Sequence, residues 1–245
     1  MINQQKKNRL IILGIFAMTL IPFLIAWGLK ENPGLLTGRT NHGQLIIPPI
    51  TTERADLTGF DPFSEANIKE LIGHWLIVNV IPGAHCRKSC LEALLKTRQL
   101  RLMLNKDLPR TRRVVMVYQT IPAEQAGQWW LKDALLWVLR REQNNEDSAL
   151  FQRLLEEENR IDPSLEAKLI EQAKSGRAIN SDLIRVVPDD ALQQKIAGLR
   201  KTPIPDGLLF IMDPLGNIMM QYEPGFDPYQ VKSDLMHLLR SSQIG

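Results

Sequence analysis

The longest uncharged stretch of this chain runs from Leu10 to Leu29, and it divides the sequence into two parts of different kinds. A helix of that length spans about 30 Å, which matches the hydrocarbon core of a bilayer. A cleavable secretory signal usually has an apolar region of about 7–15 residues that ends in a small-x-small site. No clean site of that kind follows here, so we predict an uncleaved transmembrane helix over residues 10–29.

Basic residues on the N-terminal side of this span set its predicted orientation. Lys6, Lys7 and Arg9 precede it, whereas Lys30 and Glu31 follow it and cancel in charge. By the positive-inside rule, residues 1–9 stay in the cytoplasm and the rest of the chain lies outside. The N-terminus lacks the Arg- and Ser-rich pattern of an organelle transit peptide. The predicted location is therefore a bacterial inner membrane with a periplasmic domain, where disulfides are permitted.

The part after the span divides into a linker at residues 30–61 and a domain at residues 62–245. Turn-forming residues, among them Asn32-Pro33-Gly34 and Pro48-Pro49, mark the linker, although residues 44–47 have the composition of an edge strand. The whole chain carries a net charge of only +3, which gives no reason to expect nucleic acid as a partner.

Strand-like and helix-like segments alternate in the domain. The apolar, β-branched run at residues 75–81 is typical of a strand buried on both faces, and a helix is expected from Cys86 to about Met103. An Asp-Pro-Leu-Gly turn joins the last two strands in a hairpin, and an amphipathic helix follows at residues 229–240. The expected strands are 75–81, 114–118, 183–187, 208–212 and 218–222. This order predicts an α/β, thioredoxin-like fold with a central mixed sheet.

A segment at about residues 123–198 is longer than such a core needs, and we predict a helical insertion there. Residues 129–138 form a helix that is apolar nearly all round, which indicates a helix buried between other elements. Its three tryptophans are interpreted as core, with a docking face as the alternative. Residues 156–158 and 163–174 are expected to form a solvated helical hairpin.

Cys86 and Cys90, in the stretch Ala-His-Cys-Arg-Lys-Ser-Cys, are the two cysteines of the chain. In a thioredoxin-like fold they lie between the first central strand and its helix, so that Cys86 caps or opens the helix. The helix dipole together with His85, Arg87 and Lys88 should lower the pKa of the Cys86 thiol below its usual value of about 8.5.

The spacing of four places both sulfurs on one helical face, where a disulfide or a two-thiolate metal site can form. On the redox interpretation, Cys86 is the exposed attacking thiol and Cys90 the resolving one. An inert disulfide is the alternative, but closing so short a loop stabilises a fold little.

Several features together resemble the Sco/SenC family. They are the apolar N-terminal span, Gly43-Gln44-Leu45-Ile46-Ile47-Pro48-Pro49, Gly73-His74-Trp75 at the start of a strand, the C-x3-C motif and the late Asp-Pro-x-Gly turn. The resemblance extends from about Leu10 to Gly245, apart from the insertion. It implies a membrane-anchored, thioredoxin-fold copper chaperone or thiol reductase used in assembling cytochrome c oxidase.

The chain departs from that family at the proposed copper site. Arg87 and Leu91 stand where the family usually has a proline after each cysteine, and the family's third copper ligand, a histidine, would fall at Pro205 or Asp206. His85 is an alternative third ligand. Two soft thiolates alone can hold Cu(I), so this ion remains the expected metal, if any is bound. Pro205 is expected to face the motif as a thioredoxin proline does.

A basic run beside the motif provides a further expectation. Between Arg87 and Arg113, nine basic residues stand against two acidic ones, a local net charge of +7. Such a surface could steer an acidic partner or rest on anionic lipid head groups, and an ordinary solvated helix face is the alternative.

The leading functional hypothesis is a periplasmic thiol–disulfide protein, possessing oxidoreductase activity, that serves cytochrome c oxidase maturation. Its partner would be a cysteine-bearing oxidase subunit or another periplasmic thiol protein. The alternative is a non-catalytic chaperone that carries Cu(I) through Cys86 and Cys90, or an assembly scaffold.

Overall fold

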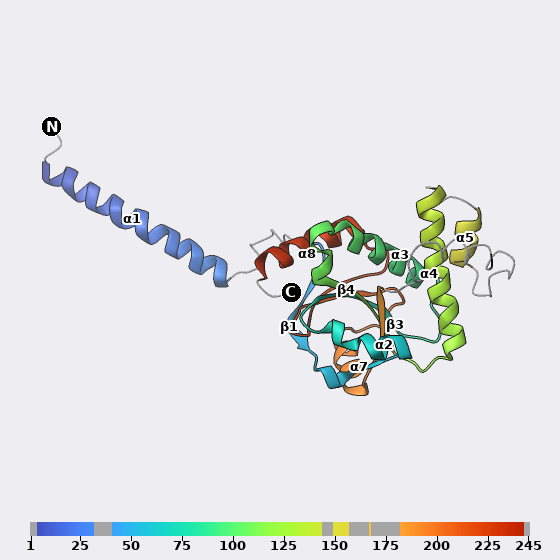
Figure 1. Ribbon diagram of the computed structural model, residues 1–245. Helices are drawn as coiled ribbons and strands as arrows, with labels where there is room; N and C mark the ends of the chain where they lie inside the picture. The colour runs from blue at the N-terminus through green and yellow to red at the C-terminus, as the bar shows by residue number, and fades with distance from the viewer. Residues whose placement is uncertain (1–3, 32–40, 144–148, 157–166, 168–181, 243–245) are drawn as a thin grey trace. The chain divides into compact units, whose positions relative to one another are not determined.

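The computed structural model describes residues 4–31, 41–143, 149–156, 167 and 182–242. The chain divides into two compact units, Met1–Asn41 and His42–Gly245. In the first unit, helix α1 (Gln4–Glu31) contains the whole predicted span (Figure 1). Its large apolar side chains are exposed. By length and composition, α1 is a candidate membrane anchor.

The second unit is built on one mixed sheet with the strand order β1-β7-β6-β3-β4-β5-β2. Strands β3, β4 and β5 pair in parallel, whereas β6, β7, β1 and β2 are antiparallel to their neighbours. The strands are β1 (Gln44–Thr51), β2 (Leu57–Gly59), β3 (Trp75–Ile81), β4 (Thr111–Val117), β5 (Leu183–Pro188), β6 (Leu209–Met212) and β7 (Asn217–Tyr222). The thioredoxin-like fold with a mixed sheet is thereby confirmed.

Helices cover both faces of the sheet (Figure 1). All seven residues of β3 are buried, because apolar side chains of α3 and α8 pack on one face and those of α7 on the other. The predicted helix after the motif and the predicted C-terminal helix correspond to α3 and α8. The helices of this unit are α2 (Pro62–Asn67), α3 (Lys88–Met103), α4 (Ala123–Gln143), α5 (Ala149–Glu156), α7 (Asp190–Ala197) and α8 (Pro228–Ser241).

The sheet begins within the predicted linker, at the residues 44–47 whose composition suggests an edge strand. Strand β1 extends through Thr51 at one edge of the sheet, with Pro48 and Pro49 inside an irregularity of its pairing with β7. Strand β2 occupies the other edge. The compact unit therefore starts at His42 rather than at the expected residue 62.

The predicted insertion contains both extra helices and core elements. Helices α4 and α5 are the additions, whereas β5 is a strand of the sheet and α7 packs against its face. Trp129 and Trp130 are buried and meet edge to face with ring centroids 5.9 Å apart, which agrees with the core interpretation. Of the predicted solvated hairpin, residues 157–158 and 163–174 lie outside the described residues, apart from residue 167.

Candidate redox site

The cysteine motif follows the carboxyl end of β3, in the centre of the sheet. Strand β3 ends at Ile81 and α3 begins at Lys88, with Arg87 as the N-cap residue. Cys86 therefore precedes the cap, and Cys90 lies in the first turn of the helix. The expectation that Cys86 itself caps or opens the helix is wrong by one residue.

Cys86 and Cys90 form a disulfide, with their Cα atoms 5.2 Å apart. This separation lies within the usual range for a bonded pair. The short loop that the bond closes removes little entropy from the unfolded chain, so a purely stabilising role explains the bond poorly. The arrangement suits a pair that opens and closes.

The disulfide is less accessible than the sequence indicates. Cys86 retains only 8% of its accessible surface and Cys90 only 2%, so the expectation of an exposed Cys86 is wrong. Both cysteines belong to one apolar cluster that joins residues of β3, β4 and α3 with residues of the inserted helices α4 and α5. Cys86 remains the more accessible of the two sulfur-bearing residues.

Two polar contacts tie the insertion to the motif. The side-chain amide of Gln125, in the first turn of α4, donates to the carbonyl oxygen of Ala84 at 2.8 Å. The Lys88 Nζ of α3 lies 3.3 Å from the Glu156 carboxylate at the end of α5. His85 stands between these contacts in sequence and is exposed. The loop before α3 is thus held from both helices of the insertion.

A carboxylate from a distant loop lies at the N-terminus of α3. Asp206 Oδ2 accepts a hydrogen bond from the Arg87 N–H at 3.0 Å and one from the Ser89 hydroxyl at 3.3 Å. The backbone of Cys90 acts on the same carboxylate and lowers its pKa. The Arg87 side chain makes no capping bond, so Asp206 supplies the cap that the local sequence lacks.

The surroundings of Asp206 act on its pKa in opposite directions. Burial raises the pKa above its usual value, and the hydrogen bonds from Arg87, Ser89 and Cys90 offset part of that rise. Its second oxygen, Oδ1, is buried without a hydrogen-bond partner in the described part of the chain. Pro205, the residue expected to face the motif, is its neighbour in this loop, and its own role stays a prediction.

The sequence indicates that position 206 belongs to the site, but it does not predict the hydrogen bonds that Asp206 makes with Arg87 and Ser89. The resemblance placed a family histidine at Pro205 or Asp206, and the structure brings the second of these against the motif. An acidic residue carries no local signal for capping a helix that lies 119 positions away, so only the fold shows this contact.

Two of the other described histidines, His42 and His74, make contacts away from the motif. His42 Nδ1 lies 3.0 Å from the Asp234 carboxylate, and His74 Nδ1 lies 3.0 Å from the carbonyl oxygen of Ile72. Within the described residues, no cluster of three or more histidine, cysteine or acidic side chains has the geometry of a metal site. The donors that fit Cu(I) are therefore the two cysteine sulfurs, which suit this soft ion.

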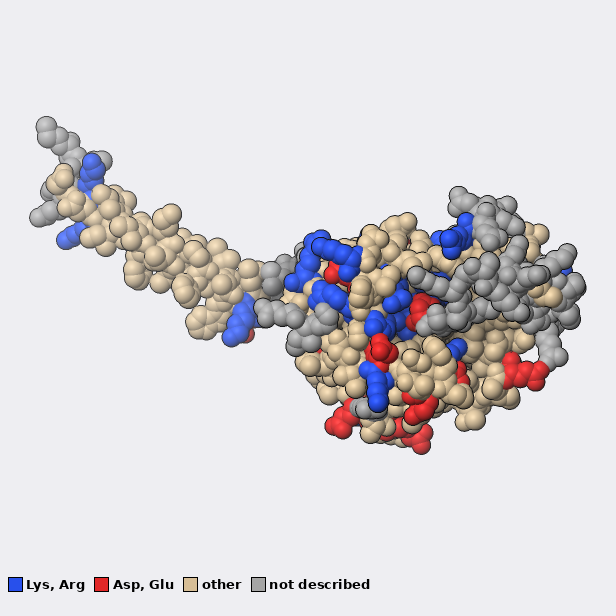
Figure 2. All heavy atoms as spheres, viewed as in Figure 1, with Lys and Arg blue, Asp and Glu red and all other residues tan. Residues whose placement is uncertain are grey.

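The basic run is largely an internal ion-pair network. Six of its nine basic residues pair with carboxylates that come mostly from other elements. The pairs are Lys88–Glu156, Arg98–Asp133, Arg101–Asp182, Arg110–Asp107, Arg112–Glu70, Arg113–Asp133 and Arg113–Asp182. Figure 2 shows acidic side chains among the lysines and arginines of the domain. Neither a free basic surface nor a simple solvated face describes this run.

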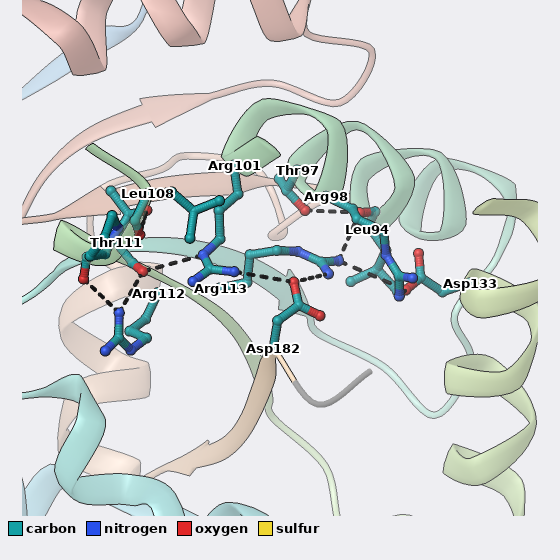
Figure 3. A network of polar contacts seen from close by, with 11 residues as sticks. Leu94, Thr97, Arg98, Arg101, Leu108, Thr111, Arg112, Arg113, Asp133 and Asp182 are labelled. Carbon is teal, nitrogen blue, oxygen red and sulfur yellow. Dashed lines mark hydrogen bonds and ion pairs between the residues drawn. The ribbon is translucent and has the colours of Figure 1, made fainter. Parts of the chain in front are cut away.

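The centre of this network lies between α3, β4 and α4 (Figure 3). Arg113 of β4 is fully buried, and it donates to Asp182 at 3.1 Å and to the Leu94 carbonyl oxygen at 2.9 Å. Asp133 of α4 accepts from Arg98 of α3 at 2.5 Å. The network therefore fixes the insertion to the same helix that begins with the cysteine motif.

Fold and motif together define a thioredoxin-like protein with a C-x3-C disulfide. A family described as transmembrane-like, thioredoxin-like, C-terminal domain matches residues 167–242. No curated protein matches the chain.

Solved structures similar to this chain include Sco proteins. Yeast Sco1 with copper bound is 11% identical, with 84% of this chain and 96% of that chain covered and a TM-score of 0.38. Apo Sco1 from Thermus thermophilus is 12% identical, with 81% and 96% covered and a TM-score of 0.40. The thioredoxin domain of a thiol-disulfide oxidoreductase from Bacteroides vulgatus is 13% identical, with 77% and 97% covered and a TM-score of 0.37. At these identities the similarity is one of fold.

Proposed function

We propose that the chain is a membrane-anchored thiol–disulfide protein whose reactive pair is Cys86 and Cys90. The observation that carries the proposal is the disulfide between them, placed after the carboxyl end of the central strand β3. Cys86, the more accessible cysteine, is the sulfur that a partner reaches first.

The proposed reaction consists of two thiol–disulfide exchange steps that together transfer two electrons. In the reducing direction, the Cys86 thiolate attacks a partner disulfide, forming a mixed disulfide and releasing one partner thiolate. The Cys90 thiolate then attacks the Cys86 sulfur and releases the second partner thiolate. The partner gains two electrons, and the pair becomes the Cys86–Cys90 disulfide, which an external dithiol must reduce again. The same steps run backwards oxidise a partner dithiol.

The setting that we propose for this chemistry is the periplasmic side of a bacterial inner membrane, in the maturation of the cytochrome c oxidase copper site. The apolar helix α1 and the basic residues before it support the orientation. The Sco/SenC resemblance supports the oxidase partner. A reporter active only outside the cytoplasm, fused after Gly245, should be active, and a silent fusion of a normally expressed protein would contradict the orientation.

Cu(I) carriage is the second candidate function, and the donor set favours it. The two sulfurs lie within one turn at the start of α3, and reduced thiolates suit a two-coordinate Cu(I) ion. The structure of yeast Sco1 with copper bound supports this candidate. Exchange in the reducing direction and Cu(I) carriage both use the reduced pair, so a trapping experiment is needed to distinguish them.

The test uses full-length Cys90→Ser protein produced in a bacterial host. Without the resolving sulfur, the mixed disulfide at Cys86 should persist and should disappear on treatment with a reductant. The matched control is Cys86→Ser, which keeps one thiol but removes the attacking one. A Cys90→Ser protein that accumulates no mixed disulfide beyond this control would contradict exchange and leave Cu(I) carriage as the function of the pair.

A further inference from the structure

The contact between Asp206 and the motif is made at the N-terminus of α3. Asp206 Oδ2 accepts a hydrogen bond from the backbone N–H of Arg87, the N-cap residue, and a second from the side-chain hydroxyl of Ser89. The carboxylate therefore occupies the position where a helix receives an anion.

The next residue holds the loop against the motif. Gly207 has a φ of +86°, and a Cβ atom there would lie 2.5 Å from the carbonyl oxygen of Ser89. A larger residue would force the two backbones apart, so the close approach depends on glycine. The position of the Asp206 carboxylate is thus set by main-chain packing as well as by its hydrogen bonds.

The negative charge of Asp206 destabilises a thiolate of the reduced pair but does not affect the uncharged disulfide. A helix N-terminus ordinarily stabilises a nearby thiolate. Here the Asp206 carboxylate already accepts from the Arg87 N–H at this terminus, and a thiolate formed in the same turn would meet a like charge. The disulfide is uncharged and has no such interaction. The carboxylate therefore favours the oxidised form.

We propose that Asp206 is a positioning residue that holds the motif turn and sets the redox balance of the Cys86–Cys90 pair toward the disulfide. The proposal rests on the proposed exchange function. Asp206 carries no electrons: when a dithiol opens the disulfide, two electrons pass to the cysteine sulfurs and the dithiol becomes a disulfide. The two thiol protons of the dithiol reach the cysteines through solvent.

The test equilibrates the full-length protein in detergent with mixtures of reduced and oxidised dithiothreitol. The fraction of reduced pair is read from the mass added by alkylation after acid quenching. Asp206→Asn and Asp206→Ser remove the charge but keep an oxygen acceptor for the helix. Each should raise the equilibrium constant for reduction about tenfold, whereas Asp206→Glu should stay near the wild-type value.

The matched control is Asp189→Asn. Asp189 caps α7 and accepts from the Leu192 N–H at 2.7 Å, so it is the same kind of capping aspartate in another helix. Its loss should lower thermal stability without changing the equilibrium constant. A role of Asp206 confined to structure would give the same result, with both redox forms destabilised equally.

An unchanged constant in both neutral Asp206 variants would overturn the role of Asp206 and leave the proposed function standing. Because Asn and Ser differ in size, either variant that folds decides the matter, as judged by its circular dichroism. Failure of the proposed function has a different signature: dithiothreitol leaves the wild-type pair oxidised, or Cys90→Ser traps no partner.

Discussion

Replacing Arg113 tests whether the buried ion-pair network holds the insertion on the core. The Arg113 side chain is 0% exposed and lies between the carboxylates of Asp182, at 3.1 Å, and Asp133, at 3.8 Å. Arg113→Met keeps an unbranched apolar stem but removes the guanidinium, leaving the buried Asp133 with fewer positive charges around it. Removing one partner of a buried pair costs about 3–5 kcal/mol.

The matched control is the preceding residue of the same strand. Arg112 pairs with Glu70 at 2.8 Å, but its side chain is 22% exposed and that of Glu70 is 51% exposed. Ion pairs open to solvent contribute about 0–1 kcal/mol. Arg112→Met should therefore cost far less than Arg113→Met, although both variants lose one positive charge from β4.

The measurement is the free energy of unfolding of the full-length protein in detergent, from denaturant titrations followed by circular dichroism. For a domain of this size, each kcal/mol corresponds to about 2–4 °C in Tm, so Arg113→Met should melt roughly 10 °C below the wild type. Adding Asp182→Asn to Arg113→Met should recover part of the loss, because it removes one stranded charge. Equal losses at Arg112 and Arg113, or no recovery, would refute the reasoning.

Three further outcomes are expected. Burial raises the pKa of Asp182, but the nearby arginine charges outweigh it and the net shift is downward. Its stabilisation should be complete above about pH 4 and lost as pH falls through the lowered pKa. The free energies of unfolding of the wild type and Asp182→Asn should converge in acid, and a constant gap would contradict this. Phe151 of α5 is buried in the apolar cluster that contains both cysteines. Phe151→Ala should destabilise the protein by about 3–5 kcal/mol and should speed the reduction of the disulfide by dithiothreitol. An unchanged reduction rate would show that α5 does not limit the access of dithiothreitol to the disulfide. The reduced protein should retain Cu(I) but not Cu(II) after desalting, should lose Cu(I) on Cys90→Ser and should be little changed by His85→Ala, as metal analysis would show.

The elements that the sequence predicts are those with a long local pattern. Strand β3 is apolar except for Asn79, and α1 is apolar over about the thickness of a bilayer core, so both can be predicted without knowledge of their neighbours. Strand β2 has only three residues, too few to show a period, and α2 has only six. Strand β2 lies in the segment taken as a linker, and α2 follows it directly. Their contacts with β5, the pairing of β2 and the hydrogen bond between Ser64 and Arg185, join residues more than a hundred positions apart.

The candidate site likewise has some features that the local sequence predicts and others that only the folded chain shows. The cysteines, their spacing and their place before a helix are local features and follow from the sequence. The burial of Cys86 depends on α4 and α5, which return over the motif only in the folded chain. The local net charge of residues 87–113 wrongly suggests a free basic surface for a related reason. The carboxylates that neutralise Arg98 and Arg113 lie far away in the sequence, in α4 and at Asp182. Net charge over a window counts neighbours in sequence, whereas electrostatics depends on neighbours in space.

The two edges of the sheet have a consequence for how a partner is recognised. Proline has no N–H, so Pro48 and Pro49 interrupt the donors along β1, and β2 at the other edge offers only three residues. Neither edge is a good template for an added strand. On the proposed exchange function, a partner that does not add a strand to the sheet must be recognised by side chains around the motif. Helices α4 and α5, whose apolar residues share a cluster with both cysteines, are then the elements where substitutions would change partner specificity.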